Sequence, residues 1–108
     1  MEIIMAKAVI LVATLTVRPE SLAEFQEVVA DLASATRIEE GNIDYEMHRS
    51  NDDMHEFVMI EHWRSQKDLD DHLAQSYTKA AFSRFRDLLR GDPRLQLLTC
   101  LTGDQPAR

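Results

Sequence analysis

The histidines of this chain and its only tryptophan lie within residues 40–73. An imidazole has an ordinary pKa of about 6.5, so near neutral pH it can accept a proton from a phenol or an activated C–H bond. His72 lies between Asp71 and Leu73 in a helix-like segment, where a ring nitrogen could reach the open face of a sheet. We therefore predict that His72 is the catalytic base. The alternative is a histidine that only packs its ring over the sheet.

Glu61 is the second candidate for a catalytic role. Alternate residues of a strand share a face, so Glu61 lies on the same face as Phe57, Met59 and Trp63. If buried there, a carboxylate must be paired or protonated; Glu61 would either orient a His or Arg or form a salt bridge at an interface. Trp63, Phe57 and Met59 are the expected walls of a pocket for an aromatic substrate. Trp63 could also be an anchor of the core or of a dimer interface.

Further side chains are candidates for the pocket lining. His48 and His62 share their strand faces with Glu46 and Arg64, so they line a polar corner of the pocket or a solvated surface between strands, and the second is favoured. Tyr77 either caps the pocket mouth or belongs to the core. The remaining residues of the predicted lining are Phe82, Val9 and Leu11.

The sequence predicts neither a metal site nor a disulfide. The histidines have neither His-x-x-x-His nor His-Glu-x-x-His spacing, and Cys100 is the only cysteine. Zinc sites need grouped ligands, and an intrachain disulfide needs a second cysteine. We therefore expect no metal.

The strands that would carry these side chains are predicted by β-branched residues and by alternating polarity. Four segments have this character: residues 8–17, 43–49, 55–64 and 95–101. Residues 50–54 are mostly turn formers, so the second and third strands are expected to form a hairpin.

Two helical regions are predicted between these strands. The first begins near Ser21, which could form a capping box with Glu24, and carries apolar residues at steps of three and four. The second begins after Ser65, breaks near Ser76 and ends before Gly91. The order βαββαβ predicts one α+β domain over residues 1–108, with a ferredoxin-like antiparallel sheet and helices on one face. Its core spans about residues 8–101, and residues 102–108 form a polar tail.

The first predicted strand is apolar on both of its faces. A sheet that is covered on one side only does not need such a strand. We therefore expect the uncovered face to meet the same face of a second copy, so that two sheets close into a dimeric α/β barrel. The expected partner of the chain is itself, as a homodimer.

Charge and hydropathy exclude several partners. The net charge of −7 argues against nucleic acid, because binding to phosphate backbones depends on clustered Lys and Arg. No apolar run reaches the length of a membrane span, and residues 1–7 lack the pattern of a signal peptide. The sequence thus predicts a cytoplasmic protein that binds neither nucleic acid nor membrane.

Short motifs in a fixed order connect these segments to a known family. The motifs are Glu40-Gly41-Asn42, Tyr45-Glu46-Met47-His48-Arg49-Ser50, Phe57-Val58-Met59-Ile60-Glu61-His62-Trp63 and Asp71-His72-Leu73. Through them, residues 8–101 resemble the antibiotic biosynthesis monooxygenase family of dimeric α/β-barrel proteins, whose small members include cofactor-free quinol oxygenases. The family also includes a haem-degrading branch, which needs an axial histidine and an asparagine. In this sequence Phe82 and Val9 stand at those two positions. Neither side chain can bind iron or donate the expected hydrogen bond.

The resemblance implies a cofactor-independent monooxygenase. Its substrates would be O₂ and a small electron-rich aromatic, either a hydroquinone or a polyketide phenol, which it would oxidise to a quinone. An isomerase or lyase acting on a small oxygenated metabolite is an alternative, because proton transfer alone needs only a base and partners for an oxyanion. A dimer that binds a ligand without catalysis is a third possibility.

Overall fold

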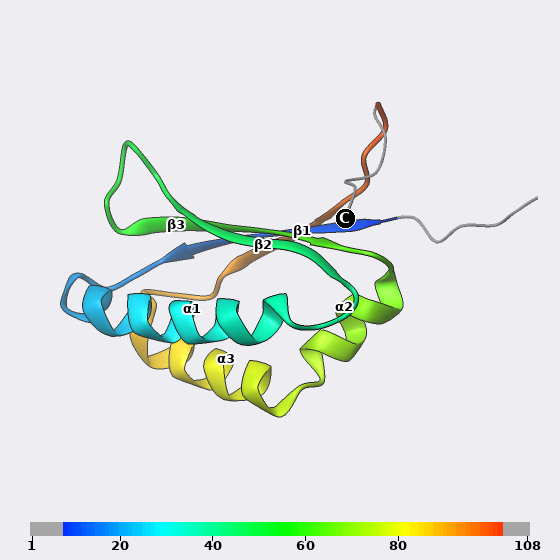
Figure 1. Ribbon diagram of the computed structural model, residues 1–108. Coiled ribbons are helices and arrows are strands. Elements are labelled where there is room, and N and C mark those ends of the chain that lie inside the picture. Colours follow the sequence, from blue (N-terminus) through cyan, green and yellow to red (C-terminus); the bar gives the residue numbers. More distant parts are fainter. Residues whose placement is uncertain (1–7, 103–108) are drawn as a thin grey trace, which may run out of the picture.

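A single antiparallel sheet with helices on one side makes up the part of the chain that the computed structural model describes, residues 8–102 (Figure 1). The strands are β1 (Val9–Thr16), β2 (Asn42–Arg49), β3 (Glu56–Trp63) and β4 (Arg94–Leu98), in the sheet order β2-β3-β1-β4. The helices are η1 (Pro19–Ser21), α1 (Leu22–Arg37), α2 (Gln66–Leu73) and α3 (Ser76–Leu88). This arrangement confirms the predicted ferredoxin-like α+β fold. The last strand ends three residues earlier than predicted.

The register of the strands fixes which side chains face the helices. β3 alternates strictly, with Phe57, Met59, Glu61 and Trp63 buried and the residues between them partly exposed. Across the sheet, Leu11 of β1 pairs with Glu61. Phe25 of α1 packs against Phe57, with ring centroids 4.9 Å apart, so this face of β3 is the one that the helices cover. The predicted faces of the third strand are therefore confirmed.

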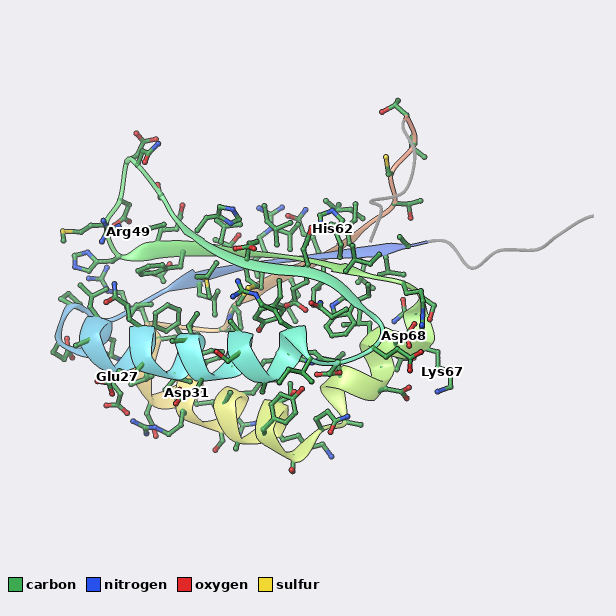
Figure 2. The ribbon with its side chains drawn as sticks, in the orientation of Figure 1. Glu27, Asp31, Arg49, His62, Lys67 and Asp68 are labelled. Atoms are coloured by element: carbon green, nitrogen blue, oxygen red, sulfur yellow. The ribbon has the colours of Figure 1, made fainter. Side chains whose placement is uncertain are left out.

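Helix α1 covers the sheet through the stripe that its sequence predicts. Phe25, Val29, Leu32 and Thr36 recur at steps of three and four, and all are buried. Phe25 also lies 5.5 Å from Phe85 of α3, measured between ring centroids, and so joins the two long helices. The opposite face of α1 is solvated, as its Glu27 and Asp31 show in Figure 2.

The two serines that were expected to begin helices behave differently. The Ser65 side chain accepts a hydrogen bond from the Asp68 amide at 3.2 Å, which confirms it as the N-cap of α2. The predicted capping box at Ser21 is wrong, because its side chain makes no cap hydrogen bond. Ser21 instead ends the short 3₁₀ turn that Pro19 begins, and its backbone (φ −107°, ψ 3°) is not the extended conformation that usually directs a capping side chain.

The connection between α1 and β2 is built around Gly41. Its carbonyl accepts a hydrogen bond from the Arg64 amide at 2.8 Å, and the Asp68 side chain packs directly on its Cα. Asp68 is held there by Arg64, whose Nε donates to it at 2.9 Å. These contacts explain why a glycine is needed between Glu40 and Asn42. They also fix the start of α2 relative to the end of β3.

Substituting Gly41 by alanine is expected to destabilise the fold. A Cβ at this position would overlap the Asp68 side chain, so Asp68 must move away from Arg64 and Ser65, at a cost of about 1–3 kcal/mol in the free energy of unfolding. Gly91→Ala is the matched control, because a Cβ there meets no atom within 4 Å. Urea denaturation of both variants measures the difference. Equal losses of stability in the two would contradict the packing role of Gly41.

Candidate active site

A cavity of about 760 Å³ lies between the sheet and helices α2 and α3. Its walls are mainly apolar and include Leu11, Met59, Leu69 and Phe82. At the β4 edge the wall includes Leu95 and Leu97, which remain 62% and 59% exposed. A cavity of this size can hold a substrate larger than a single aromatic ring.

Glu61 places a carboxyl group on this apolar wall. The residue is only 5% exposed, and the Trp63 indole donates a hydrogen bond from Nε1 to Glu61 Oε1 at 2.9 Å. Burial raises the pKa of Glu61 to about 7, with a small further increase from the charge of Glu39. The hydrogen bond from Trp63 opposes this increase because it stabilises the charged form. Glu61 can therefore both accept and release a proton near neutral pH.

Tyr45 lines the cavity beside this carboxyl group. It lies on β2 directly across from Glu61 on β3, and its side chain is buried. Burial, and next the negative charge of Glu61, raise the pKa of the Tyr45 hydroxyl far above its ordinary value. The hydroxyl therefore keeps its proton at every physiological pH and remains a hydrogen-bond donor.

His72 lies in a buried cluster next to the cavity and does not line it. Its ring is 1% exposed, and Nδ1 is 2.7 Å from Glu39 Oε2. The Tyr77 hydroxyl donates to the same carboxylate oxygen. The imidazole packs against the indole of Trp63, with ring centroids 4.6 Å apart. A continuous chain of contacts thus leads from Tyr77 and Glu39 through His72 and Trp63 to Glu61.

The structure separates the other predicted lining residues into three groups. Leu11, Met59 and Phe82 line the cavity. Trp63 is completely buried and is connected to the cavity only through its hydrogen bond to Glu61. Val9 lies opposite Trp63 in the sheet and does not line the cavity. His62 lies on the face of the sheet away from the helices, where its Nδ1 is 2.6 Å from Asp44 Oδ1 (Figure 2).

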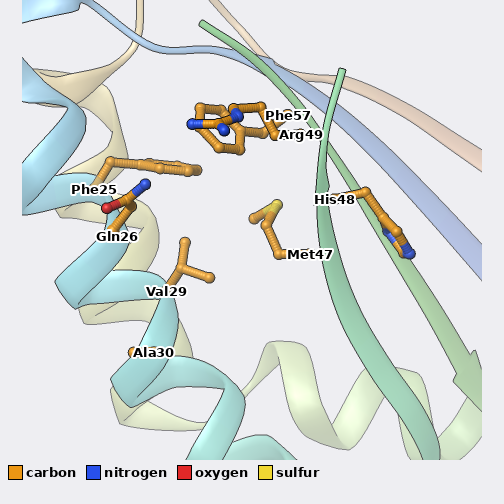
Figure 3. Close-up of a pocket in the computed structure, with 8 residues that line it drawn as sticks. All are labelled: Phe25, Gln26, Val29, Ala30, Met47, His48, Arg49 and Phe57. Atoms are coloured by element: carbon orange, nitrogen blue, oxygen red, sulfur yellow. The ribbon is translucent and has the colours of Figure 1, made fainter. Parts of the chain in front are cut away.

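The third group lines a separate, shallow groove of about 390 Å³ between α1 and the edge strand β2 (Figure 3). Phe57 and His48 belong to this groove together with Met47 and Arg49. The His48 side chain is exposed, and its Nδ1 is 3.2 Å from the Val58 carbonyl oxygen. Phe57 and His48 therefore lie away from the Glu61 carboxyl group.

Several polar residues of the site were not predicted from the sequence. Tyr45 could have been found, because its strand parity and its pairing with β3 place it opposite Glu61. Arg86 could also have been found, because it follows Phe82 by four residues and so shares its helix face. Arg18 and Glu39 lie just outside regular elements, where periodicity gives no signal.

Within residues 8–102, no three side chains of His, Cys, Asp or Glu are grouped as the ligands of a metal ion would be. None of the helices in this part of the chain is long and apolar enough to cross a bilayer.

The chain is similar to proteins that are already known. Residues 8–84 match the family profile described as Antibiotic biosynthesis monooxygenase. A Bacillus subtilis (strain 168) protein named "Putative monooxygenase YcnE" is 27% identical over 81 residues, which is 75% of this chain and 85% of that protein.

Solved structures give the same result. PA3566 from Pseudomonas aeruginosa is 29% identical and superposes with a TM-score of 0.82, covering 92% of this chain and 99% of its own. A Caulobacter crescentus CB15 protein described as a "putative antibiotic biosynthesis monooxygenase" is also 29% identical, with a TM-score of 0.85 and coverage of 91% and 93%. The similarity extends over nearly the whole length of these chains.

Proposed function

Because this chain belongs to the antibiotic biosynthesis monooxygenase family, we propose that it is a cofactor-independent monooxygenase that oxidises a small electron-rich aromatic, a hydroquinone or a polyketide phenol, to a quinone. The observation that carries the proposal is the carboxyl group of Glu61, buried on the wall of an apolar cavity with a pKa of about 7. Such a group can remove a proton from a phenol bound in the cavity.

In the proposed reaction, Glu61 takes the proton of a substrate hydroxyl. The resulting phenolate gives one electron to O₂, and the substrate radical and superoxide combine to form a peroxide at a ring carbon. Glu61 returns its proton to the peroxide. The ring carbon then loses its own proton as the O–O bond breaks, so one oxygen atom stays on the ring as a quinone carbonyl and the other takes up that proton and departs as water. The Tyr45 hydroxyl, which keeps its proton, lies beside Glu61 and can donate a hydrogen bond to the substrate oxygen.

His72 has a positioning role in this proposal. It packs on Trp63 and is bound to Glu39, so it holds the indole that donates to Glu61. Its burial within this cluster favours Glu61 over His72 as the group that contacts the substrate.

Oxygen uptake tests the proposed function. The purified protein, treated with EDTA and freed of any flavin or haem, is expected to consume one O₂ per quinone formed from at least one member of a panel of hydroquinones and naphthols. Loss of this activity on chelation would reject the cofactor-free mechanism. Turnover of an oxygenated metabolite without oxygen uptake would instead support an isomerase or lyase.

The uncovered face of the sheet supports a homodimer. Ile10, Val12 and Ile60 lie on the face opposite the helices and are only partly covered, and Leu98 of β4 continues this apolar surface. An exposed patch of this kind on a central strand suits isologous contact with a second copy, which closes two sheets into a barrel. A cytoplasmic location remains part of the same proposal.

Light scattering is expected to give a mass of about 25 kDa, twice the 12.4 kDa of the chain. Val12→Arg places a charge in the middle of the apolar face and should shift the mass to that of one chain. Lys67→Ala on the exposed surface of α2 is the control and should remain dimeric. If the parent is a monomer at micromolar concentration, the barrel arrangement is wrong.

A further inference from the structure

Three arginines lie together on the wall of the cavity, close to the end of β1. Arg18 follows β1, and its Nε donates to the Leu89 carbonyl at 3.1 Å. The backbone of Arg90 also lies at the end of β1, because its amide donates to the Thr16 carbonyl at 2.8 Å. Arg86 lies one helical turn earlier, in the last turn of α3, and also lines the cavity.

Some arginines of the chain are paired with a carboxylate, and those of the cavity wall are not. Arg37, Arg64 and Arg84 each pair with a carboxylate of the chain. Among residues 8–102, no carboxylate oxygen lies within 4 Å of the nitrogens of Arg18, Arg86 or Arg90. Arg49 and Arg94 also lack such a partner, but they do not line this cavity, whose wall includes the acidic Asp92 as well. In a chain with 19 acidic and 12 basic residues, three arginines on the wall of one cavity, each without a carboxylate partner, form a local positive site.

The positive site and Glu61 lie toward different ends of the cavity. Glu61 pairs with Leu11, whereas the arginines surround the end of β1 beyond Leu15. Four residues of strand separate Leu11 from Leu15, which is about 13 Å. A substrate that reaches both groups must be longer than one benzene ring.

We propose that the substrate carries an anionic group, a carboxylate or a sulfate or phosphate ester, which Arg18, Arg86 and Arg90 bind while its phenolic end lies beside Glu61. A guanidinium presents a planar pair of N–H donors that matches such an oxyanion. Arg18 uses only its Nε, at the Leu89 carbonyl, so its two terminal nitrogens remain available beside those of Arg86 and Arg90. The proposal rests on the proposed function only in placing the phenol at Glu61. It adds a selection for charge and length that neither family membership nor the Glu61 carboxyl group implies.

Binding without oxygen separates this inference from the proposed reaction. The probes are 6-(2,5-dihydroxyphenyl)hexanoate and its neutral primary amide, titrated calorimetrically into the full-length protein under nitrogen. The acid is expected to bind at least about 10-fold more tightly than the amide at low ionic strength, and added salt should reduce that ratio. Arg86→Gln should reduce the ratio by about 10-fold, whereas Arg49→Gln, which changes an exposed arginine of the other groove, should leave it unchanged.

The outcomes distinguish the two proposals. If acid and amide bind equally, or if Arg86→Gln and Arg49→Gln behave alike, the anion site is rejected and the oxygenase proposal is unaffected. If the acid binds preferentially but is not oxidised when air is admitted, while no other phenol consumes oxygen, the anion site stands and the oxygenase proposal fails. Sulfate and phosphate esters of the same side chain then identify the preferred anion.

Discussion

Glu61→Gln is expected to abolish turnover and at the same time to stabilise the protein at pH 8. Turnover should fall by a factor of about 10² or more, because an amide cannot take the proton of a phenol. The stability change follows from the raised pKa of Glu61, about 7 in the folded protein against 4.5 in the unfolded chain. A substitution that improves stability while it removes activity is typical of a strained functional group.

The difference between the two pKa values of Glu61 makes the stability of the protein depend on pH. Below pH 4.5 the carboxyl group is protonated in both states and has no effect on the unfolding equilibrium. Between pH 4.5 and 7 the unfolded chain releases the proton while the folded protein retains it, so stability falls as the pH rises. Above pH 7 the loss is complete and amounts to about 3 kcal/mol, which Glu61→Gln removes.

Chemical denaturation of the parent and of Glu61→Gln at pH 5 and pH 8, together with oxygen uptake, measures both effects. Trp63→Phe is the informative companion, because it keeps a ring in the core but removes the donor to Glu61. The pKa of Glu61 should then rise further, so the acidic limb of the rate profile moves to higher pH. Unchanged oxygen uptake by Glu61→Gln would exclude Glu61 as the base.

His72→Ala is expected to cost about 3 kcal/mol or more in the free energy of unfolding. The substitution leaves the Glu39 carboxylate without its imidazole partner and opens a void beside Trp63. Any loss of turnover would follow from the displaced indole. His48→Ala is the control, because that side chain is exposed and its removal should change stability by less than about 0.5 kcal/mol.

Fluorescence distinguishes a positioning role from a purely structural one. Trp63 is the only tryptophan, so its emission reports directly on the contact with His72. His72→Ala should move this emission to longer wavelength and alter the pH profile of turnover, because the donor to Glu61 is no longer fixed. A variant that is less stable but has the parent's emission and pH profile would contradict the proposed role of His72.

The contrast between Glu61 and His72 shows what the sequence could predict. Alternation along β3 was sufficient to place Glu61, Met59 and Trp63 on one buried face, because a strand has only two faces. The position of His72 depends on the direction that the short helix α2 takes after β3. That direction is set by the contact between Asp68 and Gly41, two residues that are far apart in the sequence. Local patterns therefore predicted the sheet and its buried carboxyl group, but not the cluster behind it.

The exposed leucines of β4 have a kinetic consequence. Leu95 and Leu97 form part of the cavity wall and yet are open to solvent, so within a single chain a molecule can enter along the strand without any helix moving aside. Capture of a ligand would then be a simple encounter, with a rate constant set by diffusion and orientation and not by the slow opening of a lid. Selection among ligands would then occur after entry, through differences in their dissociation rates.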